Sequence, residues 1–358
     1  MRKKIVGMLT TATLLTMALA GNVQAAEIRS VGPDGEAAVD ASTIELTDDQ
    51  IAQIKEGGYT AAICLHYGGN DWSTSQQKGL EDTFGELGIE IVAVTDANFS
   101  AETQVSNIET VMAKKPDILV SIPTDATATA DAYKQAAAAG IKIIFMDQRA
   151  NGLEAGKDYV SVVSADNYGN GYASGTVLGD ALGGKGKVAM VYYDANFAPT
   201  NQRDEGFRDA MKNYPDIEIV TEQGFTDESG CAEQGDAILT QFPNIDGIYA
   251  SWDVPMEGVL SAVRAAGMEG KVTLACNDLG NNVAREIASG NIAGGGAQMP
   301  YDQGVAEAKL AVLALLGEET PSYVAVPAET VTHENVLEAY TDVYHVETPD
   351  WLKEAYVE

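Results

Sequence analysis

Polar and aromatic residues follow several apolar runs of this chain, at points where a buried strand would end. In chain order they are Asn70, Asp71, Trp72, Asp147, Arg149, Asp166, Asn167, Trp252, Asp253, Asn277 and Asp278, with Arg203 early in a predicted helix. Carboxylate, amide and guanidinium groups each hydrogen-bond two neighbouring hydroxyls, and an aromatic face covers the C–H side of a sugar ring. The set therefore favours a polyhydroxylated ligand. Each Asp or Asn taken alone fits a helix N-cap or a turn equally well, and each Trp fits a core, although the adjoining Asp favours a partly hydrated site.

The sequence offers little catalytic machinery. Its three histidines, His66, His333 and His345, lack the spacing of a metal site or a catalytic triad, and no GxSxG elbow is present. The segment 179–185, GDALGGK, is followed by Gly where a phosphate-binding loop needs Ser or Thr, so we interpret it as a helix stop. No GxGxxG follows the first predicted strand. We expect no cofactor and no metal, and we interpret His66, at a strand end, as a packing or hydrogen-bonding residue.

The segment from Lys115 to Arg149 predicts the unit that positions one of the acids. Residues 118–122 form a short apolar run suited to a strand buried on both faces. An Ala-rich helix follows and ends at Gly140, and residues 141–145 then predict a second buried strand. Asp147 follows that strand directly, so a βαβ unit delivers it to the carboxyl edge of a sheet.

A similar pattern returns about 130 residues later, from Phe242 to Asp278. Asp253 takes the place of Asp125, the run Ala-Ala-Gly recurs at 265–267, and Asn277-Asp278 replaces Asp147. Two copies at so long a period indicate paired domains of similar α/β construction.

The rest of the chain continues the alternation of helices and strands. Thr47 and Gln50 have capping-box spacing at the start of the first predicted helix. Further strands are predicted at 59–66, 89–95, 159–163, 187–193, 217–223, 292–299 and 324–326, and further helices at 76–87, 101–114, 168–182, 197–214, 230–241, 301–316 and 334–340.

The N-terminus predicts export. Residues 1–25 have a basic start, an uncharged apolar middle and small residues before Ala26, which is typical of a cleaved secretory signal peptide. An uncleaved membrane anchor is the alternative, but four threonines and a polar end disfavour it. Residues 26–45 are rich in Gly, Ala, Asp and Glu without periodicity and predict a flexible leader. We therefore expect a periplasmic protein whose mature chain does not insert into a membrane.

The amino-acid composition limits the classes of partner that the protein can bind. Lys and Arg number 22 against 53 Asp and Glu, a net charge of −31, and so acidic a surface repels nucleic acid and anionic lipid. The cysteines Cys64, Cys231 and Cys276 are odd in number and widely spaced, so we expect buried thiols.

Several segments together resemble the type I periplasmic substrate-binding proteins of ABC sugar importers, in the ribose and galactose group. The resemblance covers residues 59–326 and lies in NDWSTSQQKGL, PTDATATADAYKQAAAAGIKIIFMD, VVSADN, NQRDEGF, NIDGIYASWDVPMEGV and GAQMPYDQG. It implies two Rossmann-like α/β domains with parallel sheets, joined by a three-segment hinge, with the ligand between them. The lobes would comprise 46–165 plus 299–326 and 166–298 plus 327–358.

The resemblance also implies site residues. Asn70 and Trp72 match the polar and aromatic contacts of the first loop, Asp147 the hydroxyl-binding acid, Arg203 the arginine of the second domain, and Gln298 the glutamine near the last hinge crossing. The chain departs from the family pattern at three places. Gln148 stands where an arginine is usual, with Arg149 one position later; Trp252-Asp253 replaces Asn-Asp; and 276–278 shifts the expected acid. The ligand therefore need not be ribose.

We thus expect a monomeric receptor that binds a sugar or polyol and delivers it to an ABC permease. Two alternatives stay open: a receptor that passes its ligand-bound form to a sensor or chemotaxis system, and an extracytoplasmic enzyme acting on a carbohydrate, since the same fold carries many functions. The sequence does not name the sugar.

Overall fold

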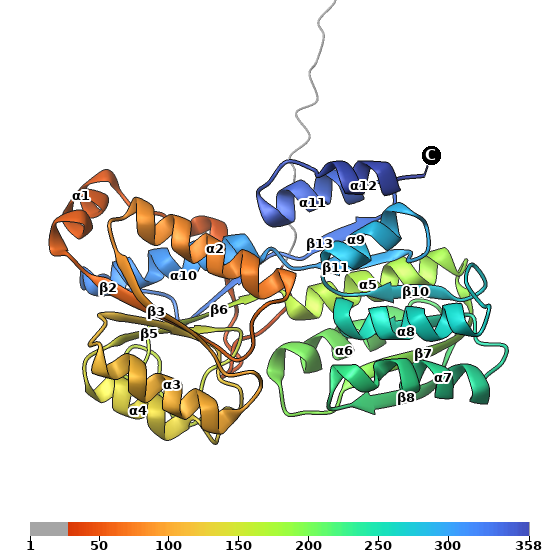
Figure 1. Ribbon diagram of the computed structural model, residues 1–358, viewed down its shortest axis with the longest axis horizontal. Coiled ribbons are helices and arrows are strands. Elements are labelled where there is room, and N and C mark those ends of the chain that lie inside the picture. The colour runs from red at the N-terminus through yellow and green to blue at the C-terminus, as the bar shows by residue number, and fades with distance from the viewer. Residues whose placement is uncertain (1–27, 358) are drawn as a thin grey trace, which may run out of the picture.

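The computed structural model describes residues 28–357, so the predicted signal peptide and the first two residues of the predicted leader lie outside the described residues. The chain forms two α/β lobes side by side (Figure 1). The first lobe contains β1 (Val39–Asp40), β2 (Thr60–Leu65), β3 (Glu90–Asp96), β4 (Ile118–Ser121), β5 (Lys142–Met146), β6 (Ser161–Ala165), β12 (Tyr323–Val326), η1 (Ala41–Thr43), α1 (Asp48–Gly57), α2 (Asp71–Glu86), α3 (Ala101–Ala113), α4 (Ala130–Ala138) and α10 (Pro300–Leu315).

The second lobe is built on the same plan with a smaller sheet. It contains β7 (Lys185–Tyr193), β8 (Asp216–Phe225), β9 (Gly247–Ala250), β10 (Thr273–Cys276), β11 (Gly294–Ala297), β13 (Glu329–Thr332), α5 (Asn167–Ala181), α6 (Ala198–Met211), η2 (Glu228–Gly230), α7 (Cys231–Gln241), α8 (Asp253–Ala265), α9 (Asn281–Ala288), α11 (Val336–Tyr344) and α12 (Asp350–Ala355). Of the elements of the two lobes, β1, β13, η1, η2, α9 and α12 were not predicted.

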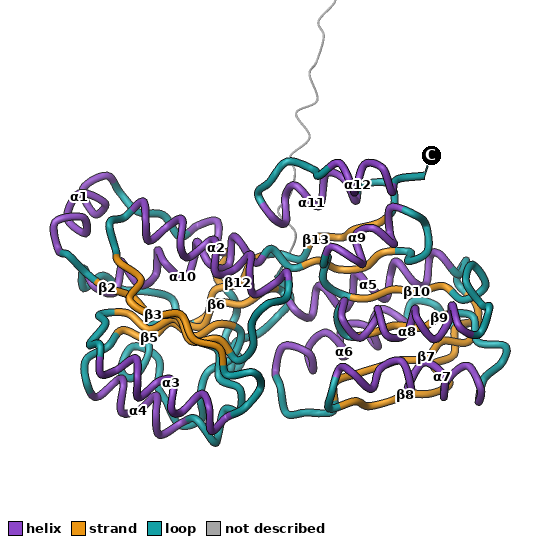
Figure 2. The backbone as a smooth tube through the Cα atoms, in the orientation of Figure 1, coloured by secondary structure: helices purple, strands orange, loops and turns teal. Residues whose placement is uncertain are grey.

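Each lobe is a sheet between helices, as Figure 2 shows. The seven-stranded sheet has the order β1-β12-β6-β5-β4-β2-β3 and the six-stranded sheet the order β13-β11-β10-β9-β7-β8. Between the described strands of these two sheets, every pairing is parallel except that of β11 with β13. In the first lobe α2 and α10 cover one face and α3 and α4 the other. The fold confirms the predicted pair of Rossmann-like lobes.

The predicted βαβ unit and its repeat both form. In the first, β4 is buried throughout, α4 ends before Gly140, whose φ of 87° suits glycine, and β5 runs to Met146. The repeat comprises β9, α8 and β10. The capping box of Thr47 and Gln50 starts α1 as predicted. Apolar runs bounded by glycine therefore carried enough information to place these elements.

Three crossings join the lobes. The first passes from β6 to α5 through Asp166, the second from β11 to α10, and the third from β12 to β13. The backbone N–H of Asp166 donates to the carbonyl of Val326 at 2.8 Å, which ties the first crossing to the third. The parallel sheets direct their carboxyl ends at the space between the lobes, where ligands of such folds collect.

The predicted flexible leader is wrong for residues 28–45. Val39–Asp40 pairs in parallel with β12, Val31 bridges to Ala37, and Ile44 is buried in the core of the first lobe. The composition misled because backbone hydrogen bonds, and not apolar periodicity, order this segment.

Two further expectations concern the described residues. The thiols of Cys64, Cys231 and Cys276 are free and buried, as predicted. Within residues 28–357, no helix combines the length and apolar character needed to cross a membrane.

Candidate ligand site

A cavity lies between the lobes at the carboxyl ends of the strands. The space open to the centre of a water molecule is about 60 Å³, enough for several water molecules. The first lobe lines it with His66, Tyr67, Asn70, Trp72, Phe99, Ile122, Thr124 and Asp147. The second lobe contributes Tyr193, Phe197, Pro199, Thr200, Arg203, Trp252 and Asp278, and Gln298 enters from the second hinge crossing.

Asp147 presents a carboxylate to the cavity directly after β5. Its backbone has a φ of 54°, a left-handed conformation that only Asn, Asp and Gly adopt readily. The Ser164 hydroxyl donates to Oδ1 at 2.8 Å, Gln303 Nε2 lies 3.5 Å from the same oxygen, and the backbone N–H of Ala165 also hydrogen-bonds the carboxylate. Burial raises the pKa of Asp147, and the Ser164 hydrogen bond and the charge of Arg203 offset part of that rise. The carboxylate lines the cavity and has lone pairs that can accept a hydrogen bond from a ligand hydroxyl.

Arg203 faces Asp147 from the second lobe. Its Nε donates to Asn167 Oδ1 at 2.8 Å, and its Nη1 donates to the Ser251 carbonyl at 3.2 Å and to Asp278 Oδ2 at 3.1 Å. Burial lowers the pKa of Arg203, but the carboxylates of Asp278 and Asp147 more than offset this and raise it overall. Among the described residues Nη2 has no hydrogen-bond acceptor, so one guanidinium nitrogen remains for a ligand.

Close packing of α5 on α6 fixes the position of Arg203. A Cβ at Gly171 would clash with the carbonyl oxygen of Arg203, and a Cβ at Gly206 would clash with the carbonyl of Tyr168. Glycine at both positions lets the two helices approach closely. The close approach sets the guanidinium beside the hinge residue Asn167.

Asp278 is the second carboxylate of the cavity. It lies two residues beyond β10 with a φ of 67°, the conformation that Asp147 also has. Its Oδ1 accepts a hydrogen bond of 2.8 Å from Gln298 Nε2, while Oδ2 pairs with Arg203. Gln298 Oε1 is buried with no hydrogen-bond partner in the described part of the chain. The predicted Gln298 therefore offers an acceptor to a ligand donor.

The first turn of α2 supplies the polar and aromatic contacts predicted at 70–72. Asn70 is the N-cap: its Oδ1 accepts from the Ser73 N–H at 2.9 Å, and its Nδ2 donates to the Tyr67 hydroxyl at 2.7 Å. Trp72 is buried, and its indole N–H has no partner within residues 28–357. Both residues line the cavity, and Trp72 offers it a donor.

Aromatic rings form much of the remaining wall. His66 of the first lobe stacks on Phe197 of the second, with ring centroids 5.9 Å apart, and Tyr67 stacks on Phe99 at 4.2 Å. Burial lowers the pKa of His66 to about 3, so the ring is neutral. Trp252 donates its indole N–H to Glu228 at 2.8 Å, which leaves its ring as an apolar surface. Such surfaces suit the C–H faces of a sugar.

Two predicted residues lie outside the cavity because their side chains turn elsewhere. Arg149 donates to the Leu153 carbonyl at 2.7 Å and pairs with Asp34 at 2.6 Å, away from the ligand. Asp71 accepts hydrogen bonds from the backbone and side chain of Asn281, at 2.7 and 2.8 Å, and so connects α2 to α9 across the cleft.

Three other predicted residues lie behind the cavity wall. Asn167 is buried and positions Arg203. Asn277 is fully buried, where its amide donates to the Tyr249 hydroxyl and the Ser251 carbonyl at 2.8 and 3.0 Å. Asp253 is buried beside Asp278, and burial together with that charge raises its pKa. The structure places these three as supporting residues, and Asp278 takes the position in the cavity predicted for Asn277.

The aromatic lining was largely missed from the sequence. Tyr67 and Tyr193 stand at the ends of β2 and β7, so the rule that selected Asp147 would also have found them. Phe99 and Phe197 lie in loops whose course the sequence does not show.

The comparisons with known proteins agree with this geometry. Residues 61–319 match the model of the periplasmic binding protein domain, and the chain belongs to that family. It is 25% identical to the ribose import binding protein of Salmonella typhimurium over 73% of this chain and 86% of that protein. It is 26% identical to the D-allose-binding periplasmic protein of Escherichia coli, over 70% and 83% of the two chains.

Two solved structures extend the comparison. An ABC transporter periplasmic solute binding protein from Actinobacillus succinogenes with bound D-allose has a TM-score of 0.72 and 29% identity, and the match covers 78% of this chain and 99% of that one. An ABC transporter solute binding protein from Agrobacterium vitis with bound alpha-D-tagatopyranose has a TM-score of 0.74 and 26% identity, covering 82% and 100%. Both similarities extend over both lobes.

Proposed function

We propose that this protein is an extracytoplasmic receptor that binds one small sugar or polyol between its lobes and delivers it to an ABC permease. The observation that carries the proposal is the set of cavity atoms without protein partners. Trp72 Nε1, Thr124 Oγ1 and Gln298 Oε1 are buried and have no partner within residues 28–357. Buried polar atoms are nearly always hydrogen-bonded, so these atoms call for a ligand with several donors and acceptors.

The charges of the cavity favour a neutral ligand. Arg203 already pairs with Asp278 at 3.1 Å, so its charge is largely compensated, and Asp147 adds a further carboxylate. An anionic sugar would bring a negative charge next to two acids. By their names and bound molecules, the four relatives compared above bind ribose, allose and tagatose, which are neutral sugars.

A thermal-shift panel tests the ligand class. D-ribose, D-allose, D-tagatose, a set of polyols, a sugar phosphate and free amino acids would each be added to the purified protein. A ligand at ~100 times its dissociation constant adds about 2.7 kcal/mol of stability, which raises the melting temperature by several degrees. We expect a neutral sugar or polyol to give that shift. A shift from an amino acid, with none from any sugar or polyol, would overturn the assignment.

The remaining parts of the proposal need separate tests. Cross-linking in native membranes would distinguish an ABC permease from a sensor as the partner, and turnover of the bound sugar by purified protein would point to an enzyme instead. An N-terminal sequence of the exported protein starting at Ala26 would establish cleavage of the signal peptide. Light scattering would establish whether the receptor is a monomer.

A further inference from the structure

Residues 28–40, which we call the N-terminal strap, are fixed first to the first lobe. Val39–Asp40 forms a parallel pair with β12, and Asp34 pairs with Arg149 at 2.6 Å. Between these points the backbone folds back on itself, because Gly32 N donates to the Glu36 carbonyl at 2.8 Å and Val31 bridges to Ala37. The strap lies outside residues 61–319, the range that matches the family.

The strap then contacts the hinge. The backbone N–H groups of Arg29 and Ser30 donate to the two carboxylate oxygens of Asp166 at 3.0 and 2.8 Å. Tyr168 N donates to the Ser30 hydroxyl at 2.9 Å, and Ser30 is 3% exposed. Asp166 is the residue at which the chain crosses between the lobes for the first time. Its carboxylate therefore holds the strap and caps α5 at once.

Beyond the hinge the strap reaches the second lobe. The Arg29 guanidinium lies over the ring of Tyr172 on α5, 4.2 Å from its centroid. On α6, Gln202 Nε2 donates to the Val31 carbonyl at 3.2 Å. One continuous segment thus contacts the first lobe, the hinge and the second lobe.

These contacts belong to a closed arrangement of the lobes. Asp71 of the first lobe hydrogen-bonds Asn281 of the second, and Ala198 N of the second lobe donates to Gln148 Oε1 of the first at 3.4 Å. A separate space of about 190 Å³ lies between the strap residues Val31 and Pro33 and both lobes. The strap therefore lines the space between the lobes on this side.

We propose that the N-terminal strap is a fourth connection between the lobes that favours the closed form and so tightens ligand binding without touching the ligand. A contact made in one of two conformations shifts their equilibrium by its own free energy. Apparent affinity scales with the population of the binding-competent form. The proposal rests on the closure that the proposed function requires, but on no particular sugar.

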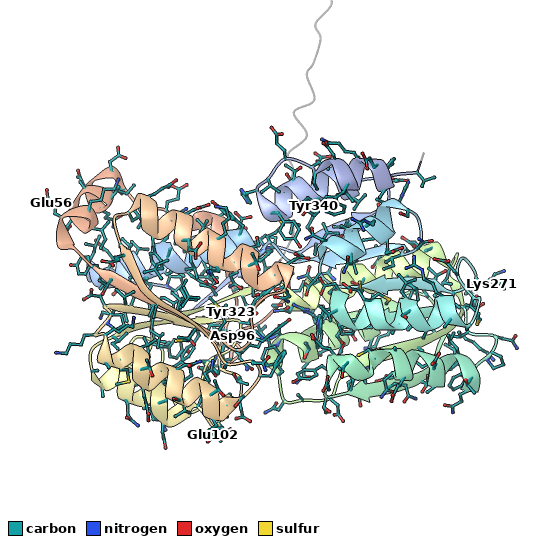
Figure 3. The ribbon with its side chains drawn as sticks, viewed as in Figure 1. Glu56, Asp96, Glu102, Lys271, Tyr323 and Tyr340 are labelled. Carbon is teal, nitrogen blue, oxygen red and sulfur yellow. The ribbon has the colours of Figure 1, made fainter. Side chains whose placement is uncertain are left out.

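Distances between lobes test this without any ligand. Spin labels would be placed in two pairs, Glu56→Cys with Lys271→Cys and Glu102→Cys with Lys271→Cys, because these exposed residues lie at separated points of the two lobes (Figure 3). The two distances from position 271 in the second lobe to positions 56 and 102 in the first lobe together give the direction in which one lobe rotates relative to the other. The native cysteines are buried, which directs labelling to the introduced ones.

The double variant Arg29→Ala with Gln202→Ala removes the two side-chain contacts with the second lobe beyond the hinge and keeps the anchors on the first lobe and on the hinge. We expect its ligand-free closed population to fall by about tenfold relative to the open one, from the loss of one cation–π contact and one hydrogen bond. The sugar found in the thermal-shift panel should bind correspondingly more weakly. Arg264→Ala is the matched control, because Arg264 pairs with Glu269 and Glu286 inside the second lobe.

Unchanged ligand-free distance distributions in the double variant would overturn the proposal. The single variant Gln202→Ala should show a smaller shift in the same direction, and it covers the case in which the double variant folds poorly. Failure to find any sugar ligand would count against the proposed function but would leave the spin-label result decisive for the strap.

Discussion

Asp71 connects the lobes from outside the ligand cavity, and its removal tests whether closure contacts set affinity. Its two carboxylate oxygens accept from the backbone and side chain of Asn281 at 2.7 and 2.8 Å. The Asn281 side chain is held in place because its Oδ1 accepts from the Tyr340 hydroxyl at 2.6 Å. The carboxylate also lies at the N-terminus of α9, where negative charge is favourable. Asp71→Ala removes all of these interactions from the closed form.

The magnitude follows from the number and exposure of these contacts. A hydrogen bond to a charged group contributes about 1.5–3 kcal/mol in a buried site. Here Asn281 is exposed and both partners regain water on opening, so about 1 kcal/mol for each bond is the better value. The sum of about 2 kcal/mol corresponds to a roughly thirtyfold weaker affinity. Because the contact forms on closure, most of the change should appear in the rate of ligand release.

Surface plasmon resonance with the sugar from the thermal-shift panel would measure both rates. Asp49→Ala is a matched control, since Asp49 is an exposed acid in the first turn of α1 within the first lobe. A double-mutant cycle with Asn281→Ala isolates the pair, because the two changes should then be less than additive. Dissociation constants within about twofold of the wild type for Asp71→Ala, with full additivity in the cycle, would refute this account of closure.

Three further predictions concern buried ionisable residues. Arg203→Met should abolish detectable sugar binding in calorimetry and lower the free energy of unfolding by about 3 kcal/mol, because it leaves the Asp278 carboxylate, 11% exposed, without its ion-pair partner. Glu307 is fully buried, Gln76 donates to its Oε1, and burial raises its pKa well above its ordinary value. The protonated Glu307 side chain is therefore favoured in the folded state. Its contribution to the free energy of unfolding is fully present below the unfolded-state pKa and is lost as pH rises through the folded-state pKa. Urea unfolding of Glu307→Gln should lack that loss, and an identical pH profile would contradict the assignment. Burial lowers the pKa of His66 to about 3, so its contribution is present above about pH 6.5, the unfolded value, and is lost as pH falls toward 3. His66→Phe should flatten the stability profile across that window, and a slope equal to that of the wild type would exclude His66 as its source.

The fold was accessible from the sequence where burial imposes a pattern. Strands covered on both faces need mostly apolar residues, and β4 (ILVS) and β5 (KIIFM) accordingly appear as short, mainly apolar runs, the first followed by Pro123 and the second preceded by Gly140. The missed elements lack that signal. The edge strand β13 alternates without a strong apolar run, and β1 is a two-residue edge strand that forms only because β12 offers backbone partners.

The sequence was sufficient to predict which strand ends carry the candidate site. It was not sufficient to predict which side chains at those ends point into the cavity. Asn277 and Asp278 are neighbours, yet one is fully buried in the second lobe and the other lines the cavity. The choice between them depends on the left-handed backbone of Asp278, which it shares with Asp147. The Arg149 side chain points away from the cavity because it pairs with Asp34, a residue more than a hundred positions earlier in the chain. The first determinant is a backbone conformation and the second is a contact between residues far apart in the chain, so residue spacing alone revealed neither.

One chain of hydrogen bonds connects the ligand-facing Asp147 and Arg203 to the first hinge crossing. The Ser164 hydroxyl donates to Asp147 Oδ1 at 2.8 Å, Asn167 Nδ2 donates to that hydroxyl at 2.9 Å, and Arg203 Nε donates to Asn167 Oδ1 at 2.8 Å. Ser164 lies in β6 of the first lobe, and Asn167 is the first residue of α5 in the second lobe. Asp166, which binds the strap, lies between them. The charged groups that face the ligand from opposite lobes are therefore held through the first hinge crossing. A ligand hydroxyl that bridges Asp147 and Arg203 would close this chain into a ring. That ring can form in the closed arrangement alone, because opening separates its two ends.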